Sequence, residues 1–150
     1  MPGFVYKQTV MERSVREFIV PSHTKVVIGS LQTERLPNGK RRLLCDLKVD
    51  INGREYIVPS GFETDFSSVP WFGRFVVRWS KIDIAGVVHD YLYDHGAGTR
   101  SNADWVWYQV AISGSHRANL LQAWICWISL VLFGWIAWNN ARRTRAIHKS

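Results

Sequence analysis

Four acidic or imidazole side chains stand out in a chain of 150 residues that is otherwise basic and aromatic. His89 and Asp90 are adjacent, Asp65 precedes them, and Asp104 follows them. An imidazole with two or three carboxylates suits Zn²⁺, Mn²⁺ or Fe²⁺. The same side chains could instead make His89 a general base that Asp65 or Asp90 orients. These four residues are therefore the candidates for metal binding or catalysis.

Three of the four candidates also have a structural interpretation, which we favour over catalysis. Asp104 is the third residue after Ser101, the spacing of a capping box in which the carboxylate binds the backbone N–H of Ser101. Asp65 can accept backbone N–H bonds in its loop, and His89 can hold that loop through a buried hydrogen bond. We assign no catalytic residue and expect no cofactor and no tightly bound metal. The residues expected to form one buried network are Thr64, Asp65, Ser68, His89, Asp90, Tyr93, Arg100 and Asp104.

The first part of the chain has the pattern of β-strands. Residues 25–28 are rich in β-branched side chains, a Pro-Asn-Gly turn signal occupies 37–39, and residues 43–51 alternate as one strand would. Asn52-Gly53 then separates this run from the extended run 54–58. Because both central residues of a type I′ turn need positive φ, Asn-Gly predicts a β-hairpin here.

The rest of the chain has the pattern of helices. Ser80 to Asp83 has the form of a capping box, and apolar residues follow at helical spacing until Gly96 and Gly98. A second helix is expected from Ser101 to Gly114, and a third from Ser115 into the arginines at 142–145.

These elements predict one α+β domain over residues 1–150. Residues 1–60 form a β-rich part with an antiparallel sheet and hairpins, and residues 61–80 form a loop. Residues 81–146 form two or three packed helices, of which the last is long and very apolar, and residues 147–150 end the basic tail.

The charge distribution and the cysteines indicate which partners and which redox compartment suit the chain. The net charge is +7, and residues 116–150 carry five basic and no acidic side chains. Such a tail suits nucleic acid, anionic lipid or an acidic protein surface. Cys45 and Cys126 have no partner at metal-ligand spacing, so we interpret them as buried free thiols of a reducing compartment. The sequence contains no Walker loop, Cys-x-x-Cys pair or dinucleotide fingerprint.

Residues 120–138 are almost entirely apolar and contain Trp124, Trp127, Trp135 and Trp138. Nineteen such residues are long enough to cross a bilayer of roughly 30 Å, so a membrane span is one interpretation. The other is a helix buried by protein on all faces. We expect an inner stripe to pack on the domain's own helices and sheet. The outer stripe, with some of the tryptophans, should meet a neighbouring chain.

Three motifs occur in order: GFETDFSSVP at 61–70, HDYLY at 89–93 and RSNAD at 100–104. Together they resemble DUF1353, a domain-of-unknown-function family of tailed bacteriophages and prophages. The resemblance covers about residues 45–138 and extends to the pattern Phe133-Gly134-x-x-Ala137-Trp138. Trp71 departs from the family, which usually has Arg after the proline. This departure argues against an anion-binding role at that position.

The resemblance implies a virion-associated structural or accessory protein of the tail, the neck or genome ejection. Such a protein would be made in the host bacterial cytoplasm and would contact other phage structural proteins in an oligomeric or multi-copy assembly. Two alternatives from other classes stay open. One is a metal-dependent hydrolase directed at the cell wall, and the other is a membrane-inserting ejection or lysis accessory that uses residues 120–138.

Overall fold

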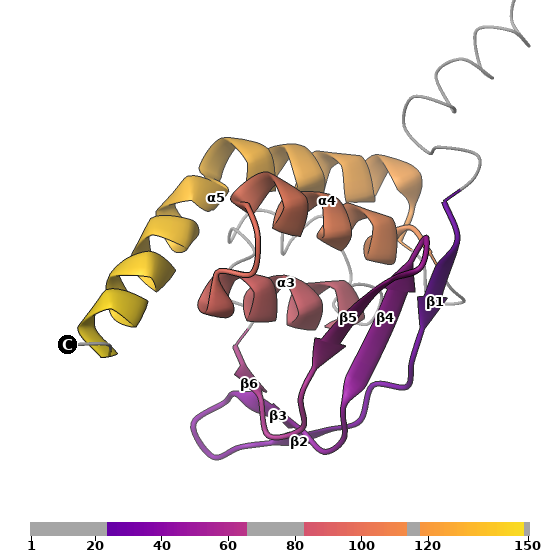
Figure 1. Cartoon of the computed structure of the whole chain (residues 1–150). Coiled ribbons are helices and arrows are strands. Elements are labelled where there is room, and N and C mark those ends of the chain that lie inside the picture. The colour runs from indigo at the N-terminus through magenta and orange to yellow at the C-terminus, as the bar shows by residue number, and fades with distance from the viewer. Residues whose placement is uncertain (1–23, 66–82, 114–117, 149–150) are drawn as a thin grey trace, which may run out of the picture.

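The computed structural model describes residues 24–65, 83–113 and 118–148. In these ranges six short strands form two three-stranded antiparallel sheets, and three helices follow (Figure 1). The helices lie side by side on one side of the strands, and the first helix is nearest to the sheets. The predicted α+β class, with strands first and helices after them, is confirmed.

The first sheet has the order β1-β4-β5, from Val26–Ile28, Leu47–Ile51 and Arg54–Val58. Its hairpin turn is the predicted one, with φ of 55° at Asn52 and 84° at Gly53. The Asn52 side chain also accepts a hydrogen bond from the backbone N–H of Lys25 at 2.7 Å. The turn therefore joins all three strands.

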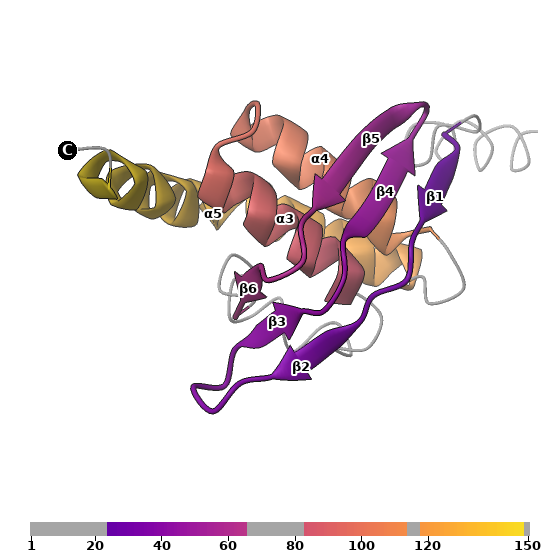
Figure 2. The same cartoon turned by 60° about the horizontal axis from the view of Figure 1, so that its bottom comes forward.

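The second sheet has the order β2-β3-β6, from Thr33–Arg35, Arg41–Leu43 and Glu63–Thr64 (Figure 2). The predicted continuous strand over 43–51 is wrong, because β3 ends at Leu43 and β4 begins only at Leu47. Between them Asp46 accepts the backbone N–H of Ser60 at 2.8 Å, which fixes a bend where the chain passes from one sheet to the other. The residues 63–64, expected to be loop, form the short edge strand β6.

The helices are α3 (Asp83–His95), α4 (Arg100–Ala111) and α5 (Leu120–His148). Gly96, with φ of 59°, ends α3 in the left-handed conformation, and Gly98, with φ of 86°, turns the chain before α4; the sequence predicted that the helix stops at these glycines. The N-cap of α4 is Thr99, whose hydroxyl accepts the Asn102 N–H at 3.2 Å, and not Ser101. Ser80 and Ser115, the other predicted caps, lie outside the described residues.

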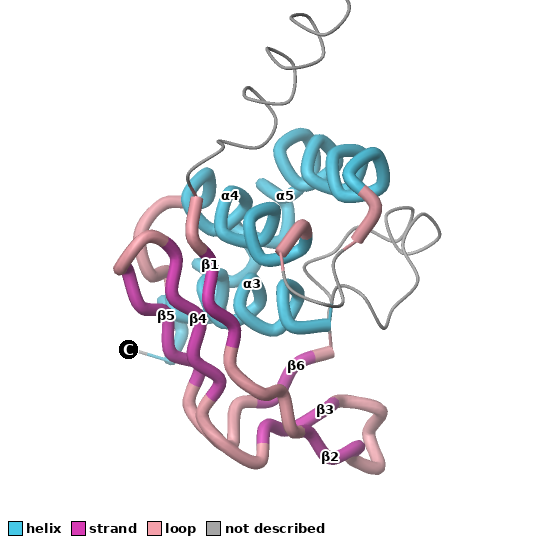
Figure 3. Tube along the Cα trace, turned by 90° about the vertical axis from the view of Figure 1, so that its right-hand side faces the viewer, coloured by secondary structure: helices cyan, strands magenta, loops and turns pink. Residues whose placement is uncertain are grey.

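The hydrophobic core lies where α3 is enclosed by the other elements (Figure 3). Val87, Val88 and Leu92 of α3 are buried, and the helix contacts β5 on one side and α4 and α5 on the other. Leu47 and Val49 of β4 are fully buried on the facing side of the sheet. Side chains on several faces of α3 are thus removed from water, and the polar ones among them need internal partners.

The turn residue Asn52 offers a stability test. Both Asn52→Gly and Asn52→Ala remove the acceptor of the Lys25 N–H, but only alanine has to hold positive φ with a Cβ. We expect Asn52→Ala to be less stable than Asn52→Gly by about 1 kcal/mol, because the left-handed conformation costs roughly that much. Urea unfolding of the two variants measures the difference, and equal stabilities would contradict the turn geometry.

Thiol reactivity tests the core. Burial raises the pKa of the Cys126 thiol to about 11, so the thiol is protonated at about pH 8. Cys45 is only partly buried. We expect iodoacetamide at this pH to alkylate Cys45 in the folded protein and Cys126 only in denaturant, as measured by peptide mass. Equal rates at both thiols in the native protein would show that the inner face of α5, which carries Cys126, is not packed on the domain.

Candidate functional site

The Asp104 carboxylate is the centre of a buried polar cluster. Asp104, a residue of α4, is only 1% exposed. Its Oδ1 lies 2.9 Å from Nε2 of His89 and accepts the phenol O–H of Tyr93 at 2.6 Å. Nη1 of Arg100 lies 3.5 Å from Oδ2. The prediction that Asp104 closes a capping box with Ser101 is wrong, because the carboxylate points into the protein.

Helical spacing explains how these side chains come together. His89 and Tyr93 are four residues apart and share one face of α3, and Arg100 and Asp104 share one face of α4 in the same way. The two helices pack against each other. The rings of His89 and Tyr93 are in contact, with their centroids 4.0 Å apart and their planes tilted by 38°. Three of the eight residues of the predicted network thus converge on a fourth, Asp104.

The hydrogen-bond roles in the cluster follow from burial. Burial, together with the nearby Asp104 charge, raises the pKa of Tyr93 far above its usual value, so its hydroxyl stays protonated and donates to Asp104. The carboxylate then acts as the acceptor, and the Nε2–H of His89 donates to it. Nδ1 of His89 is left as the nitrogen with the lone pair. It is buried and has no hydrogen-bond partner among the residues that the structure describes.

A second buried contact joins the strands to α3. The hydroxyl of Thr64, on β6, donates to the Asp90 carboxylate, and the two residues are 2% and 4% exposed. Asp65 is exposed at the end of β6, so the expectation that it is buried beside His89 is wrong. Strand alternation explains this outcome, because neighbouring residues of β6 point to opposite sides and Thr64 takes the inner one.

The other predicted network member, Ser68, lies outside the described residues, as does Trp71. Among the described residues, no group of three or more His, Cys, Asp or Glu side chains is placed to hold a metal ion. His89, Asp90 and Asp104 therefore do not form a common ligand set in this conformation. The Asp104 carboxylate, on α4, is hydrogen-bonded to His89, and the Asp90 carboxylate, on α3, accepts the hydroxyl of Thr64 on β6.

Helix α5 covers the cluster at Gly134. A Cβ added at Gly134 would lie 2.7 Å from the Tyr93 hydroxyl oxygen and 3.8 Å from Oδ1 of Asp104. Arg100 also reaches α5, where Nη1 donates to the backbone oxygens of Leu130 at 3.1 Å and Val131 at 2.9 Å. A donor inserted at mid-helix carbonyls favours bending. Figure 1 shows α5 bent between the part that lies on α4 and the part that passes the end of α3.

Beyond the bend, Arg145 is a partner of α3 that sequence reasoning missed. Its guanidinium donates to the backbone oxygen of Tyr93 and, at 3.1 Å, to that of Asp94. It also lies over the ring of Trp138, whose edge meets Tyr93. Carbonyls at a helix C-terminus lack intrahelical donors, and a cation there is favourable. No sequence signal identifies such a partner, because the residues are about fifty positions apart.

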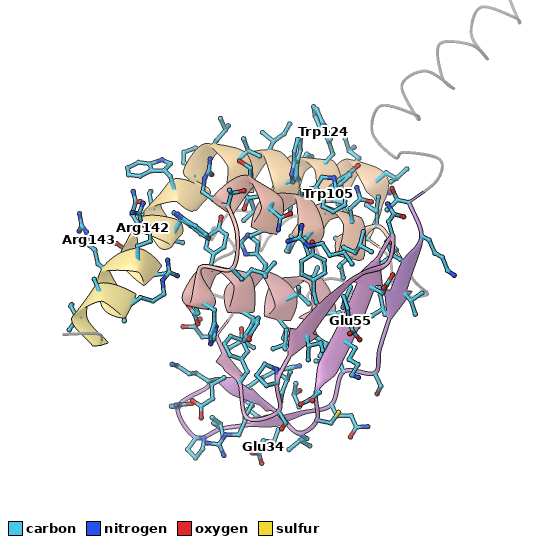
Figure 4. All side chains as sticks on the ribbon, in the orientation of Figure 1. Glu34, Glu55, Trp105, Trp124, Arg142 and Arg143 are labelled. Atoms are coloured by element: carbon cyan, nitrogen blue, oxygen red, sulfur yellow. The ribbon has the colours of Figure 1, made fainter. Side chains whose placement is uncertain are left out.

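The outer face of α5 is exposed and apolar. The inner side chains of Ala123, Cys126 and Leu130 are buried, as predicted for the inner stripe. Trp124 and Trp135 are 41% and 55% exposed. Figure 4 shows Trp124 pointing away from the bundle, and Arg142 and Arg143 projecting from the far end of the helix.

Trp127 and Trp138 are half-buried against Tyr108 and Tyr93. The helix as a whole is long and apolar enough to cross a membrane, and 28% of its most apolar window is buried in the domain. Such a helix alone is weak support for a span.

The fold and the site thus define an α+β domain with a buried His-Asp-Tyr-Arg cluster. A family model described as "Protein of unknown function (DUF1353)" matches residues 42–130, which include β4 to α4 and the first part of α5. The chain belongs to this family. No curated protein and no solved structure matches it.

The close approach of α5 yields a test at Gly134. Gly→Ala in a helix normally stabilises by about 1 kcal/mol. Here the new methyl group would strike a tyrosine hydroxyl that is held by Asp104, and overpacking costs roughly 1–3 kcal/mol. We therefore expect Gly134→Ala to lower the melting temperature, whereas Asn139→Ala, at an exposed position of the same helix, should not.

A double mutant makes the test specific. Tyr93→Phe removes the hydroxyl that the new methyl group would meet, so Tyr93→Phe with Gly134→Ala should lose less stability than the two single variants together. Thermal unfolding of the wild-type chain and the three variants gives the coupling. A stabilising Gly134→Ala, or full additivity, would contradict the contact between α5 and the cluster.

Proposed function

We propose that this chain is an accessory protein of a bacteriophage particle and docks through the outer face of α5 onto a neighbouring protein chain. The observation that carries the proposal is the exposed apolar stripe of α5. The phage setting is what the family resemblance implies, and the stripe supports a role that works through protein contacts.

The stripe has the spacing of a helix that packs on another helix. Leu121, Ile125, Ile128, Leu132 and Trp135 follow one another at intervals of four, three, four and three residues. This average of about 3.5 residues keeps the side chains along one seam, as in coiled-coil contacts. Four of the five are 38–64% exposed, and Ile128 is partly buried. Leaving these side chains in water forfeits about 25 cal/mol per Å² of apolar surface.

Charge on the same face favours an acidic partner. Arg142 and Arg143 follow Trp135 and Ile136 at a seven-residue spacing, so they extend the line of the stripe toward the C-terminal end of α5. Both are exposed. Residues 116–150 contain no acidic side chain, so a second copy of α5 could not neutralise them. We infer a different protein chain with an apolar groove and carboxylates at one end.

The contacts of Arg100 argue against a membrane span. Its guanidinium binds the carbonyls of Leu130 and Val131, which are in the middle of the apolar stretch 120–138. A transmembrane α5 would carry this charge to the centre of the hydrocarbon or break these contacts, and a charge there costs several kcal/mol. The inner stripe would also leave its place on α3 and α4.

Incorporation into particles tests the proposal. We expect an epitope-tagged chain to copurify with particles at a fixed ratio to the major virion proteins. Trp135→Glu should abolish incorporation while leaving the melting temperature almost unchanged, because the side chain is 55% exposed. Trp105→Glu is the matched control, since it places the same substitution at a 37% exposed tryptophan of α4. It should incorporate normally.

Three results would overturn the proposed docking. Retention of the chain in membranes after carbonate extraction would establish a span. Binding of the purified chain to vesicles of phosphatidylglycerol, lost in Trp135→Glu but not in Trp105→Glu, would make lipid the occupant of the stripe. Equal incorporation of both variants into particles would show that the stripe is not the docking surface.

A further inference from the structure

We infer that His89 and Asp104 form a catalytic dyad in which Nδ1 of His89 activates water to hydrolyse an acyl ester. This activity goes beyond the proposed docking role and rests on different residues. The observation that carries it is the hydrogen bonding of the imidazole, which is held firmly at one nitrogen and has no described partner at the other.

The ring is held in the tautomer that a general base needs. Oδ1 of Asp104 accepts from both the Tyr93 hydroxyl and Nε2 of His89, so the ring proton is on Nε2. The contact with the Tyr93 ring, whose centroid lies 4.0 Å away, and the 2.9 Å bond to Asp104 restrict the orientation of the ring. Nδ1 therefore presents its lone pair in a fixed direction. Orientation of a base by a buried carboxylate is the arrangement used in hydrolytic triads.

A purely structural histidine would be expected to use both nitrogens. A buried polar atom without a partner destabilises the fold, and such atoms in folded proteins call for an explanation. His89 is 0% exposed, and none of the described residues hydrogen-bonds to Nδ1. The unpaired state of this nitrogen is explained if its partner is the reacting water.

The step balances without a further reactant. Nδ1 takes a proton from water while the water oxygen bonds to the ester carbonyl carbon, which gives a tetrahedral intermediate. The intermediate collapses with cleavage of the bond to the alcohol oxygen, and the departing alkoxide takes the proton back from Nδ1. Water and ester become carboxylic acid and alcohol, and the dyad is regenerated. Among the described residues no hydroxyl or thiol contacts Nδ1, so water is the nucleophile.

The surroundings of the ring select the substrate class. His89 is fully buried on α3, and the apolar residues of this helix form one core with Val106 and Trp107 of α4 and Leu130 of α5. A group that reaches Nδ1 must tolerate apolar walls, which suits the acyl chain of a fatty-acid ester such as a glycerophospholipid. An ester also releases its alkoxide more easily than an amide releases an amine, so a single base suffices. Because the ring is enclosed, substrate binding has to include opening of the site.

The assay uses the full chain with 4-nitrophenyl octanoate and with mixed micelles of phosphatidylglycerol, each in calcium chloride and in EDTA. We expect ester hydrolysis in at least one condition. His89→Asn and Asp104→Asn should lower kcat/KM at least about 100-fold, the usual contribution of general-base catalysis. His95→Asn is the matched control, because His95 is an exposed histidine of the same helix. Its activity should be unchanged.

A spectroscopic measurement keeps the inference testable if a variant unfolds. ¹⁵N NMR of the folded wild-type chain should show Nε2 of His89 protonated and Nδ1 not. Asp104→Asn, which can offer an amide N–H to Nε2, should move the ring proton to Nδ1. A wild-type ring protonated on Nδ1 would overturn the dyad, and so would folded protein inactive on both esters in both conditions. Release of soluble peptidoglycan fragments without ester hydrolysis would overturn the substrate class. None of these readouts depends on docking to particles.

Discussion

The buried carboxylate of Asp104 is the constraint around which the helices are arranged. A carboxylate removed from water has to be surrounded by donors, and α4 itself supplies only Arg100, one turn away. The two closest donors come from α3, so α3 and α4 must pack with His89 and Tyr93 facing Asp104. Nη1 of Arg100 also donates to two backbone carbonyls of α5. One ionisable group thereby fixes the relative positions of three helices.

The same arrangement places the polar cluster and the exposed apolar stripe on opposite sides of α5. The polar cluster lies on the inner side of α5, and the apolar stripe lies on the outer side of the same helix. Gly134 lets the helix backbone come close enough to cover the cluster, and large exposed side chains such as Trp135 and Leu132 occupy the positions around it. A partner bound at the outer face, as proposed above, would therefore contact the helix that covers the cluster. Coupling between the two would need no more than a small shift of α5, because the contact at Gly134 leaves little free space.

Local sequence rules predicted the parts of the fold that local forces decide. Asn52-Gly53 forms the predicted turn because only the backbone preferences of two residues are involved. The alternation of Leu47, Val49 and Ile51 correctly predicts which side chains of β4 are buried. The same reliance on local rules gives the wrong role for Asp104. Ser101 and Asp104 have the spacing of a cap, but Thr99 caps the helix, and tertiary packing gives the carboxylate donors that the spacing rule does not consider. The partners of Arg145 and Gly134 are set by the path of α5, which no window of sequence contains.

The capping of α3 by Arg145 has a consequence for synthesis of the chain. Helix α3 ends with the carbonyls of Tyr93 and Asp94, and the Arg145 guanidinium that donates to both is encoded about fifty positions later. At roughly 5–20 residues per second, a ribosome needs several seconds to add that stretch. During this interval Tyr93 has neither the cation at its carbonyl nor α5 over its hydroxyl. The nascent strands and α3 can therefore collapse early, but the packing around the histidine is completed only when the second half of α5 has been made.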